Sequence, residues 1–265
     1  MAAFSIARLF IYPVKSLGGY AVDRAEITPS GSLRGDREWI VARPDGQMLW
    51  QGDIPRMTLL QTRLDAERLE ISAPDGAVLT LDRAHGGAAS SIVQYGHKLP
   101  GTDAGDGAAG WLGGQLGTAC RLVRVGAEAH RWGGLNPVHA VSLRSLLALN
   151  ERLIAQGDEP VEVERFRPNV VLDGDHGAFD EEAMPAISFD GAELVLREPC
   201  VRCELPNISR VDASRSKQPL KLIGGMAKGR MTAKPASFGI YAMARGEALR
   251  VGMVAVGSGR KNTPS

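Results

Sequence analysis

The segment at residues 198–206, E-P-C-V-R-C-E-L-P, carries the strongest chemical signal because two thiols, Cys200 and Cys203, lie three positions apart. A thiolate is a soft metal ligand, a nucleophile or a redox-active sulfur. Three other interpretations stay open. A structural zinc site needs two more ligands, for which the chain offers Cys120 and scattered histidines. A thioredoxin-like pair starts a helix, whereas prolines flank this pair, and two small buried hydrophobic side chains need no chemistry.

Basic and amide side chains in two other segments have the chemistry to hold a phosphate. Arg165, Arg167 and Asn169 surround the predicted start of a strand, where alternate residues point to one side. A guanidinium grips a phosphate with two parallel hydrogen bonds, which lysine cannot do. Lys15 and Ser16 end a predicted strand in a glycine-relaxed loop, a natural phosphate or pterin contact. A solvated turn is the alternative for this loop.

A third basic segment lies between residues 210 and 234, where one acidic residue, Asp212, accompanies seven basic ones: Arg210, Arg215, Lys217, Lys221, Lys228, Arg230 and Lys234. Such a loop suits an anionic cofactor, although a solvated loop explains it equally. The net charge of +1 gives no general electrostatic reason to bind nucleic acid, and no aromatic platform is interleaved with the basic residues. We therefore predict no nucleic-acid partner.

Other catalytic templates are missing from the sequence. The five histidines form no HxH or HExxH pattern, and the chain has no Walker A loop, no GxGxxG after a strand and no GxSxG. Three cysteines cannot make a disulfide framework. No apolar run reaches the ~18 residues that span a bilayer, and the first residues lack the pattern of a signal peptide. These features predict a cytoplasmic protein without a membrane span.

The elements that position these residues are mostly short strands. Turn signals separate β-rich segments in the first hundred residues, which predicts a small barrel or sandwich. The predicted strands are residues 4–14, 20–27, 36–43, 47–50, 57–63, 68–72 and 77–81. Residues 82–110 are rich in glycine, alanine and serine, which predicts a loop region and a domain boundary.

In the second part of the chain the residue pattern predicts two helices and further strands. A weak helix is expected at residues 108–116 and a strong one from the N-cap Ser142 to Gly157. The apolar face of the strong helix is predicted to contain Leu143, Leu146, Leu147, Asn150, Leu153 and Ile154. The predicted strands are residues 121–125, 169–172, 186–189, 193–196 and 248–256, and residues 257–265 are expected to form a frayed tail.

Six short motifs, in this order, resemble the two-part MOSC proteins, the family named after the C-terminal domain of molybdenum cofactor sulfurase. They are YPVKS at 12–16, RGDREW at 34–39, RFRPNVV at 165–171, PCVRC at 199–203, PLK at 219–221 and FG at 238–239. The resemblance is strongest to the amidoxime-reducing type and its bacterial counterparts. It implies a mainly β, α+β fold. An N-terminal β-barrel-like domain would span residues 1–105, a β-barrel MOSC domain with a few helices would span 106–258, and a disordered tail would span 259–265.

The resemblance also implies the site residues. Molybdenum would be held by the dithiolene of a pyranopterin and by Cys203, the residue on which catalysis depends. The implied cofactor contacts are Lys15, Ser16, Arg37, Arg167, Asn169 and Arg202. Two features depart from the family pattern. Val201 stands where a serine is usual, and residues 133–136, GGLN, lack the usual acidic and hydroxyl side chains.

The function implied by the resemblance is a molybdenum-cofactor-dependent reductase of N-hydroxylated or N-oxide-like small molecules. Electrons would come from an external donor, namely a reductase, a cytochrome or a ferredoxin-like carrier, because three cysteines are too few for an iron–sulfur domain that needs four. The alternative is a sulfur or molybdenum-cofactor carrier that uses a Cys203 persulfide or thiolate. If a cofactor binds, Lys15, Arg37, Arg167 and Asn169 should converge with Cys203 on one interdomain cleft, with the Cys203 sulfur at its floor.

Overall fold

The computed structural model describes residues 4–84, 86–126, 137–230 and 234–259. Its larger sheet has eight strands, in the order β17 (Gly257–Gly259), β13 (Ala186–Phe189), β14 (Ala192–Val201), β15 (Ser237–Gly246), β11 (Val138–Ser142), β12 (Val170–Asp173), β1 (Ser5–Ile11) and β2 (Tyr20–Val22). Strands β11 and β12 are parallel, and the other neighbours are antiparallel. The first strand of the chain therefore pairs with residues about 165 positions later.

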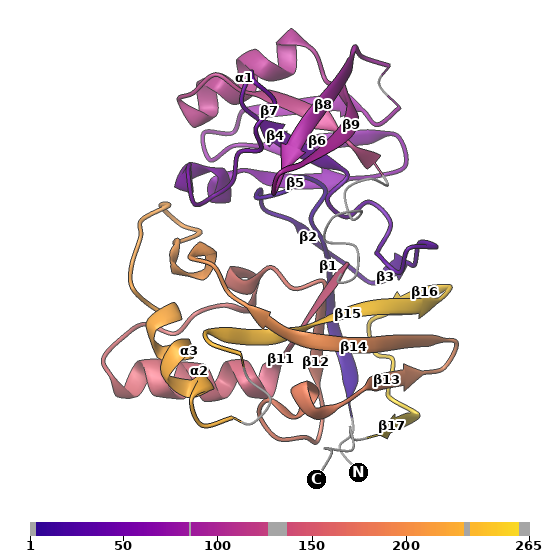
Figure 1. Ribbon diagram of the computed structural model, residues 1–265, viewed down its shortest axis with the longest axis vertical. Coiled ribbons are helices and arrows are strands. Elements are labelled where there is room, and N and C mark those ends of the chain that lie inside the picture. Colours follow the sequence, from indigo (N-terminus) through magenta and orange to yellow (C-terminus); the bar gives the residue numbers. More distant parts are fainter. Residues whose placement is uncertain (1–3, 85, 127–136, 231–233, 260–265) are drawn as a thin grey trace.

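The remaining strands form three smaller sheets. One has the order β4 (Trp39–Ala42), β10 (Arg121–Arg124), β9 (His97–Asp103) and β8 (Ala89–Gln94), and another has β5 (Gln61–Leu64), β6 (Arg68–Ser72) and β7 (Val78–Asp82). The third pairs β16 (Ala248–Arg250) with β3 (Arg24–Glu26). In Figure 1 the four-stranded and three-stranded sheets make the upper part of the molecule, and the eight-stranded sheet makes the lower part.

Three α-helices occur among the described residues: α1 (Asp106–Leu116), α2 (Leu143–Ala155) and α3 (Leu220–Ala227). The 3-10 helices are η1 (Pro55–Leu59), η3 (Val163–Phe166), η4 (Asp180–Ala183) and η5 (Leu205–Asn207). Helices α2 and α3 lie beside each other in the lower part, and α1 lies in the upper part (Figure 1). The expectation of a mainly β fold with a few helices is confirmed.

Residues after β16 bridge the two ends of the eight-stranded sheet. The Ile6 amide donates to the Met253 carbonyl at 2.9 Å, and the Ala255 amide donates to the Phe4 carbonyl at 2.7 Å. The chain then reaches β13, where the Val256 amide donates to the Ser188 carbonyl at 2.9 Å, and continues as β17. Backbone hydrogen bonds along this connection therefore link β1 to the edge of the sheet formed by β13 and β17.

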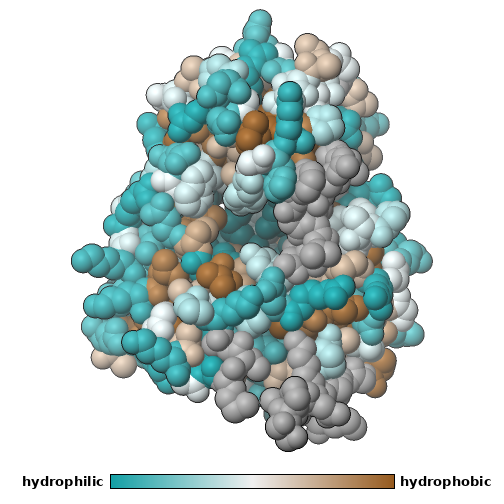
Figure 2. All heavy atoms as spheres, viewed as in Figure 1, coloured by the Kyte–Doolittle hydropathy of each residue, from teal (hydrophilic) through white to brown (hydrophobic). Residues whose placement is uncertain are grey.

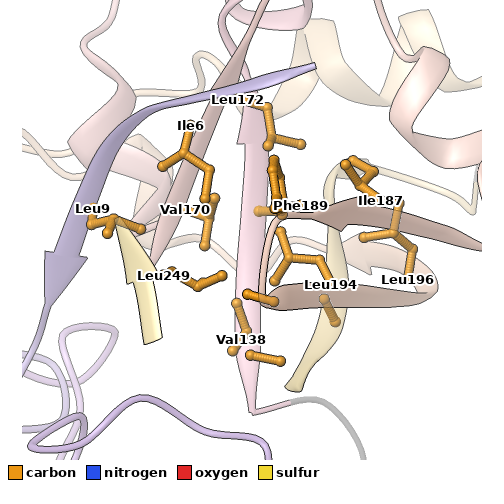
Figure 3. Close-up of a cluster of buried hydrophobic side chains, with 14 of the residues drawn as sticks. Ile6, Leu9, Val138, Val170, Leu172, Ile187, Phe189, Leu194, Leu196 and Leu249 are labelled. Carbon is orange, nitrogen blue, oxygen red and sulfur yellow. The ribbon is translucent and has the colours of Figure 1, made fainter. Parts of the chain in front are cut away.

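Alternating hydrophobic side chains build the cores. In β6, Leu69 and Ile71 are buried while Arg68 and Glu70 are exposed, as the two-residue period of a strand requires. Figure 3 shows side chains from β1, β11, β12, β13 and β14 pointing into one buried cluster. The upper part has its own core, in which Ala108, Leu112 and Leu116 of α1 pack with Trp39 of β4 and other residues. The predicted boundary between the two domains, at residues 105 and 106, stays a prediction.

The predicted loop at residues 82–110 was wrong. Strands β8 and β9 form a hairpin there, and α1 begins at Asp106. The two residues between the strands, Tyr95 and Gly96, have φ values of 51° and 81°, which suits a two-residue hairpin turn. Small side chains dilute the hydrophobic alternation of these strands, so composition alone pointed to a loop.

Several other boundaries and elements also differ from the predictions. The expected strand at 248–256 is only three residues long, the predicted tail contributes β17 at 257–259, and the expected strand at 57–63 is largely replaced by η1 and β5. Strands β11 and β15 and helix α3 were missed altogether. These elements are evident only in the folded chain. Strands β11 and β15 each lie between two other strands of the eight-stranded sheet, and α3 contacts α2. Residues 260–265 lie outside the described part.

Helix α2 begins after Ser142 as predicted, and the Ser142 hydroxyl accepts hydrogen bonds from the Arg144 and Ser145 amides. Its buried face is centred on Ser145, Leu149 and Leu153, so the predicted face was only partly right. Leu147 and Ile154 are exposed, at 52% and 59%. Ser145 can occupy the buried face because its hydroxyl donates to the Glu181 carboxyl group at 2.8 Å.

The face of the molecule in Figure 2 is hollowed where its upper and lower parts meet, and hydrophilic residues are prominent around the hollow. The junction between the two parts is therefore a polar region that the separate cores leave unfilled.

Candidate functional site

A cleft of about 220 Å³ lies at the junction of the two parts. The segment after β1 and the β8–β9 turn form one side, and residues from β11, β15 and the connections after η3 and β14 form the other. Its lining residues are Lys15, Ser16, Arg37, Tyr95, His139, Phe166, Arg167, Val201, Arg202, Cys203, Leu205 and Tyr241. The fold thus brings together six of the seven predicted site residues, and only Asn169 does not line the cleft.

The cleft is strongly cationic. Burial, followed by the charges of Arg37 and Arg167, lowers the pKa of Lys15 to about 8. Burial, followed by the charge of Arg37, also lowers the pKa of Arg167 to about 9. The charged forms of these side chains are disfavoured because burial removes them from water and because their like charges repel one another. A bound anion would relieve this repulsion.

Four lining residues have a backbone conformation that side chains other than glycine rarely adopt. The φ values of Ser16, Arg37, Tyr95 and Arg167 are 68°, 56°, 51° and 52°. Each such residue costs about 1 kcal/mol or more, and backbone strain of this kind clusters at binding sites. Hydrogen bonds hold two of them, because the Arg37 amide donates to Tyr12 and the Arg167 amide to Glu164. The strain therefore serves to direct these side chains toward the cleft.

The Tyr12 ring positions the two arginines that bridge the domains. The Arg167 guanidinium lies 4.3 Å from the ring centre, and that of Arg37 lies 4.8 Å from it. Arg37 also donates to the buried Asp36 carboxylate, which accepts the Tyr12 amide at 2.9 Å. Arg167 donates to the Leu17 carbonyl. Both guanidiniums are thus fixed before any ligand binds.

Asn169 lies behind the cleft, with only 1% of its surface exposed. Its side-chain oxygen accepts from Arg37 Nη1 at 3.1 Å and from the His139 amide at 3.2 Å. Its side-chain nitrogen donates to the Phe10 carbonyl at 3.3 Å. The structure therefore places Asn169 as a support for Arg37, out of contact with the open cleft.

The two cysteines of the central motif have opposite environments. Cys203 is exposed at the cleft, so it does not form a buried floor, whereas Cys200 is fully buried in β14. Arg202 lies between them and donates to the Cys200 sulfur at 2.8 Å and to the Phe166 carbonyl at 3.0 Å. Burial raises the pKa of the Cys200 thiol, but the nearby Arg202 and His139 outweigh burial, and the pKa lies below its usual value. Cys200 is thus an internal partner of Arg202.

Arg165 and Arg167 were expected around the start of a strand with their side chains on one side; both do precede β12, but in a 3-10 helix and its cap. Arg165 lies in η3, and Arg167 caps that helix. Arg165 donates to the Pro206 carbonyl at 3.1 Å and faces a second, smaller pocket, which Arg167 also lines. The two guanidiniums still point to a common cavity, although a 3-10 turn brings them there.

Sequence reasoning missed the aromatic and histidine members of the site. Tyr95 enters the cleft from a hairpin turn that was interpreted as a loop, and its ring lies 4.6 Å from the Lys15 ammonium. His139 and Tyr241 come from paired positions of β11 and β15. Only Gly96 is a residue that such a two-residue turn favours, so the local signal for this hairpin is weak. The strand pairing that brings His139 to Tyr241 has no signal in the local sequence.

Two features are absent from the described residues, a cluster of metal-binding side chains and a membrane-spanning helix. These residues contain no group of three or more His, Cys, Asp or Glu side chains that could hold a metal ion. A metal held through Cys203 would therefore need ligands other than these side chains. Within the same residues, no helix is long and apolar enough to cross a membrane. The GGLN segment at 133–136 lies outside the described residues.

Fold and site together define a strand-rich protein with a cationic interdomain cleft that presents one exposed thiol. Residues 3–119 match the MOSC N-terminal beta barrel domain, and residues 127–259 match the MOSC domain. The chain belongs to the MOSC family, in its two-part form, which confirms the resemblance drawn from the motifs.

Relatives of two kinds match this chain. Mitochondrial amidoxime reducing component 2 of Bos taurus is 30% identical over 245 residues, which cover 82% of this chain and 71% of that protein. The Rattus norvegicus protein of the same name is 28% identical, with the same coverage. A molybdenum cofactor sulfurase of Drosophila yakuba is 29% identical over 248 residues, which cover 89% of this chain. The chain spans only 31% of the length of that sulfurase.

Proposed function

We propose that this chain binds a molybdenum cofactor in the interdomain cleft and reduces small N-hydroxylated or N-oxide-like compounds. The observation that carries the proposal is the convergence of four cationic side chains and one exposed thiol on a single cleft. Relatives named amidoxime reducing components, which match this chain over most of its length, support a reductase.

The residues of the cleft suit the two ends of such a cofactor. Burial disfavours the positive charge of Lys15 and Arg167, and these two side chains together with Arg37 would hold the phosphate. The exposed Cys203 would supply the soft sulfur ligand of molybdenum. Arg202, fixed by the Cys200 sulfur and the Phe166 carbonyl, would donate from its exposed side. When bound, the cofactor supplies two-electron chemistry at its metal.

The cleft mouth suits a small organic substrate. Tyr95 is 70% exposed and Val201 is 50% exposed, and both line the cleft on either side of Lys15 and Cys203. Removal of one oxygen atom consumes two electrons and two protons and releases water. The chain has too few cysteines to hold an iron–sulfur cluster of its own with four thiolates. We therefore propose an external electron carrier, acting in the cytoplasm, as the donor.

Metal analysis combined with turnover tests the proposal. Freshly purified protein should contain about one molybdenum and one pterin per chain, and it should reduce a model amidoxime with an artificial reductant. Protein expressed in cells unable to make the cofactor is the control and should show neither property. Stoichiometric cofactor without reduction of amidoximes or N-oxides would refute the proposed reaction.

A carrier of sulfur or of the cofactor is the second candidate. The exposed Cys203 favours it, and so does the match of 89% of this chain to a molybdenum cofactor sulfurase. A sulfur carrier would accumulate a persulfide on Cys203, which cyanide releases as thiocyanate, and would contain no bound metal, whereas a cofactor carrier would contain the cofactor without reducing substrate. Thiocyanate release from the wild-type protein, but not from Cys203→Ser, would favour the carrier over the reductase.

A further inference from the structure

A second pocket lies next to the cleft and has a volume of about 120 Å³. The segment between Ser16 and Gly18 separates the two cavities, because Ser16 lines the cleft and Gly18 lines the pocket. Arg167 and Leu205 line both. Arg167 donates to the Leu17 carbonyl at the centre of the separating segment. The pocket is thus a neighbour of the cleft, with its own walls.

Three guanidiniums surround this pocket: Arg165, Arg167 and Arg210. Two carboxylates oppose them only weakly. Glu162 is shared between Arg165 at 3.8 Å and Arg210 at 3.7 Å, and Glu164, which lines the pocket, lies 3.8 Å from Arg8. These separations are longer than hydrogen bonds. The cationic groups therefore retain donors that could serve a ligand.

Buried polar atoms without partners indicate that the pocket is built for a ligand. Tyr12 lines it, only 3% of this residue is exposed, and its hydroxyl has no hydrogen-bond partner within the described part of the chain. Arg165 Nε is buried and lacks a hydrogen bond under the same condition. Leaving such groups unpaired is costly. Gln51 and Thr58, each 4% exposed, add two more polar side chains to the wall.

We propose that this second pocket binds a phosphate dianion, either free phosphate or the end of a small phosphomonoester, independently of any ligand in the main cleft. The Arg165 and Arg210 guanidiniums, which line only this pocket, would donate to the phosphate oxygens, and Tyr12 would add a neutral hydroxyl donor. Burial raises the pKa of Tyr12 to about 12, so the hydroxyl keeps its proton at neutral pH. The proposal concerns an anion site beyond the function proposed above and does not depend on it.

Titration of the purified chain tests the proposal. Inorganic phosphate and glycerol 3-phosphate are titrated separately by calorimetry. The probe that binds more tightly shows whether the pocket takes free phosphate or a phosphomonoester. We expect saturable binding of at least one of them, weakened about tenfold in Arg210→Gln and severalfold in Tyr12→Phe. Lys15→Gln removes the same charge from the main cleft and should change the affinity less than twofold. Circular dichroism of every variant, including Arg210→Lys, checks that the fold is kept.

Three outcomes would overturn the proposal. One is the lack of saturable binding at millimolar phosphate in the folded wild-type chain. Another is an equal loss of affinity in Lys15→Gln and Arg210→Gln, which would assign the anion to the main cleft. The last is competition between phosphate and a tightly bound cofactor, seen as phosphate binding only to cofactor-free protein. The first two results leave the molybdenum proposal untouched, and the third presupposes a cofactor in the main cleft, so failure of the pocket proposal is distinguishable from failure of the proposed function.

Discussion

At the scale of single residues, Cys200 and Cys203 differ in role because the chain leaves β14 between them. Cys200 faces the interior and accepts from Arg202, whereas Cys203 faces the cleft. We expect Cys203→Ser to abolish metal retention and reduction, because a hydroxyl is a poor soft-metal ligand. Cys200→Ser should retain most of both, since a serine oxygen can still accept from Arg202. Metal content and turnover of both variants check this, and equal losses would indicate a dithiol centre.

Arg167 is a residue whose geometry matters as much as its charge. Its guanidinium stacks on the Tyr12 ring and donates to the Leu17 carbonyl. Arg167→Lys keeps the charge but loses the planar fork, so the variant should lose cofactor about tenfold faster during dialysis. Arg144→Lys, on an exposed part of α2, is the matched control. Equal cofactor content in the two variants after dialysis would remove Arg167 from the site.

Lys15 makes the stability of the cofactor-free chain depend on pH. Burial and the neighbouring Arg37 and Arg167 lower the pKa of Lys15 from its ordinary 10.5 to about 8 in the folded chain. Between these pH values the unfolded chain binds more protons, so the free energy of unfolding should rise with pH. Lys15→Met should flatten this rise and increase the free energy of unfolding by about 2 kcal/mol at pH 7. Urea unfolding from pH 7 to 10 measures both effects, with the exposed Lys221→Met as control. Identical profiles for wild type and Lys15→Met would contradict the expectation.

At the scale of elements, the β11–β15 pair delivers His139 and Tyr241 to the cleft and requires a glycine at position 239. Gly239 has a φ of 74°, and an added Cβ would lie 2.5 Å from His139 Nε2 and 2.6 Å from the Ala140 carbonyl oxygen. Strand β15 can therefore approach β11 this closely only because position 239 has no side chain.

Substitution of this glycine should be costly. Gly239→Ala combines backbone strain with a backbone clash, and we expect a loss of about 3 kcal/mol in the free energy of unfolding. Gly191→Ala is the matched control, because Gly191 has a φ of 73° but open space around its Cβ. It should cost about 1 kcal/mol. Thermal and urea unfolding compare the two variants, and similar losses would show that the close strand approach is unimportant.

At the scale of the whole molecule, Asn169 connects the cleft to both sides of the domain junction. It lies next to β12 and hydrogen-bonds to Arg37, to the His139 amide at the β11 strand and to the Phe10 carbonyl of β1. Arg37 belongs to the segment that leads into β4 in the upper part. One buried amide thus links the arrangement of the domains to the position of a cleft cation.

Removal of this amide should affect both stability and binding. Asn169→Ala leaves buried polar groups unpaired, so we expect a loss of about 2–4 kcal/mol in stability and reduced cofactor content. Asn150→Ala is a matched control, because Asn150 makes two 2.9 Å hydrogen bonds with Val161 away from the cleft. It should lose comparable stability but keep the cofactor. Equal loss of cofactor in both variants would mean that Asn169→Ala lowers cofactor content only by destabilising the fold.

The sequence by itself determined the local features of this protein. The N-cap Ser142 predicted where α2 begins, and ordered motifs identified the family and six residues that share the cleft. These signals depend on neighbours within a few positions, or on short motifs that keep their order along the chain. The sequence could not separate Cys200 from Cys203 in burial, or Asn169 from the residues that line the cleft.

Tertiary structure alone decided which segments meet. Strand β15 and the β8–β9 hairpin carry weak local patterns, and they exist because neighbouring strands offer them hydrogen bonds and buried surface. The buried face of α2 shifted toward Ser145 because Glu181, from a distant segment, offers it a partner. The second pocket arises only where η3 approaches the segment after β1. Several of these contacts join residues outside each other's local sequence, such as Ser145 and Glu181, and local sequence carries no record of the distances between them.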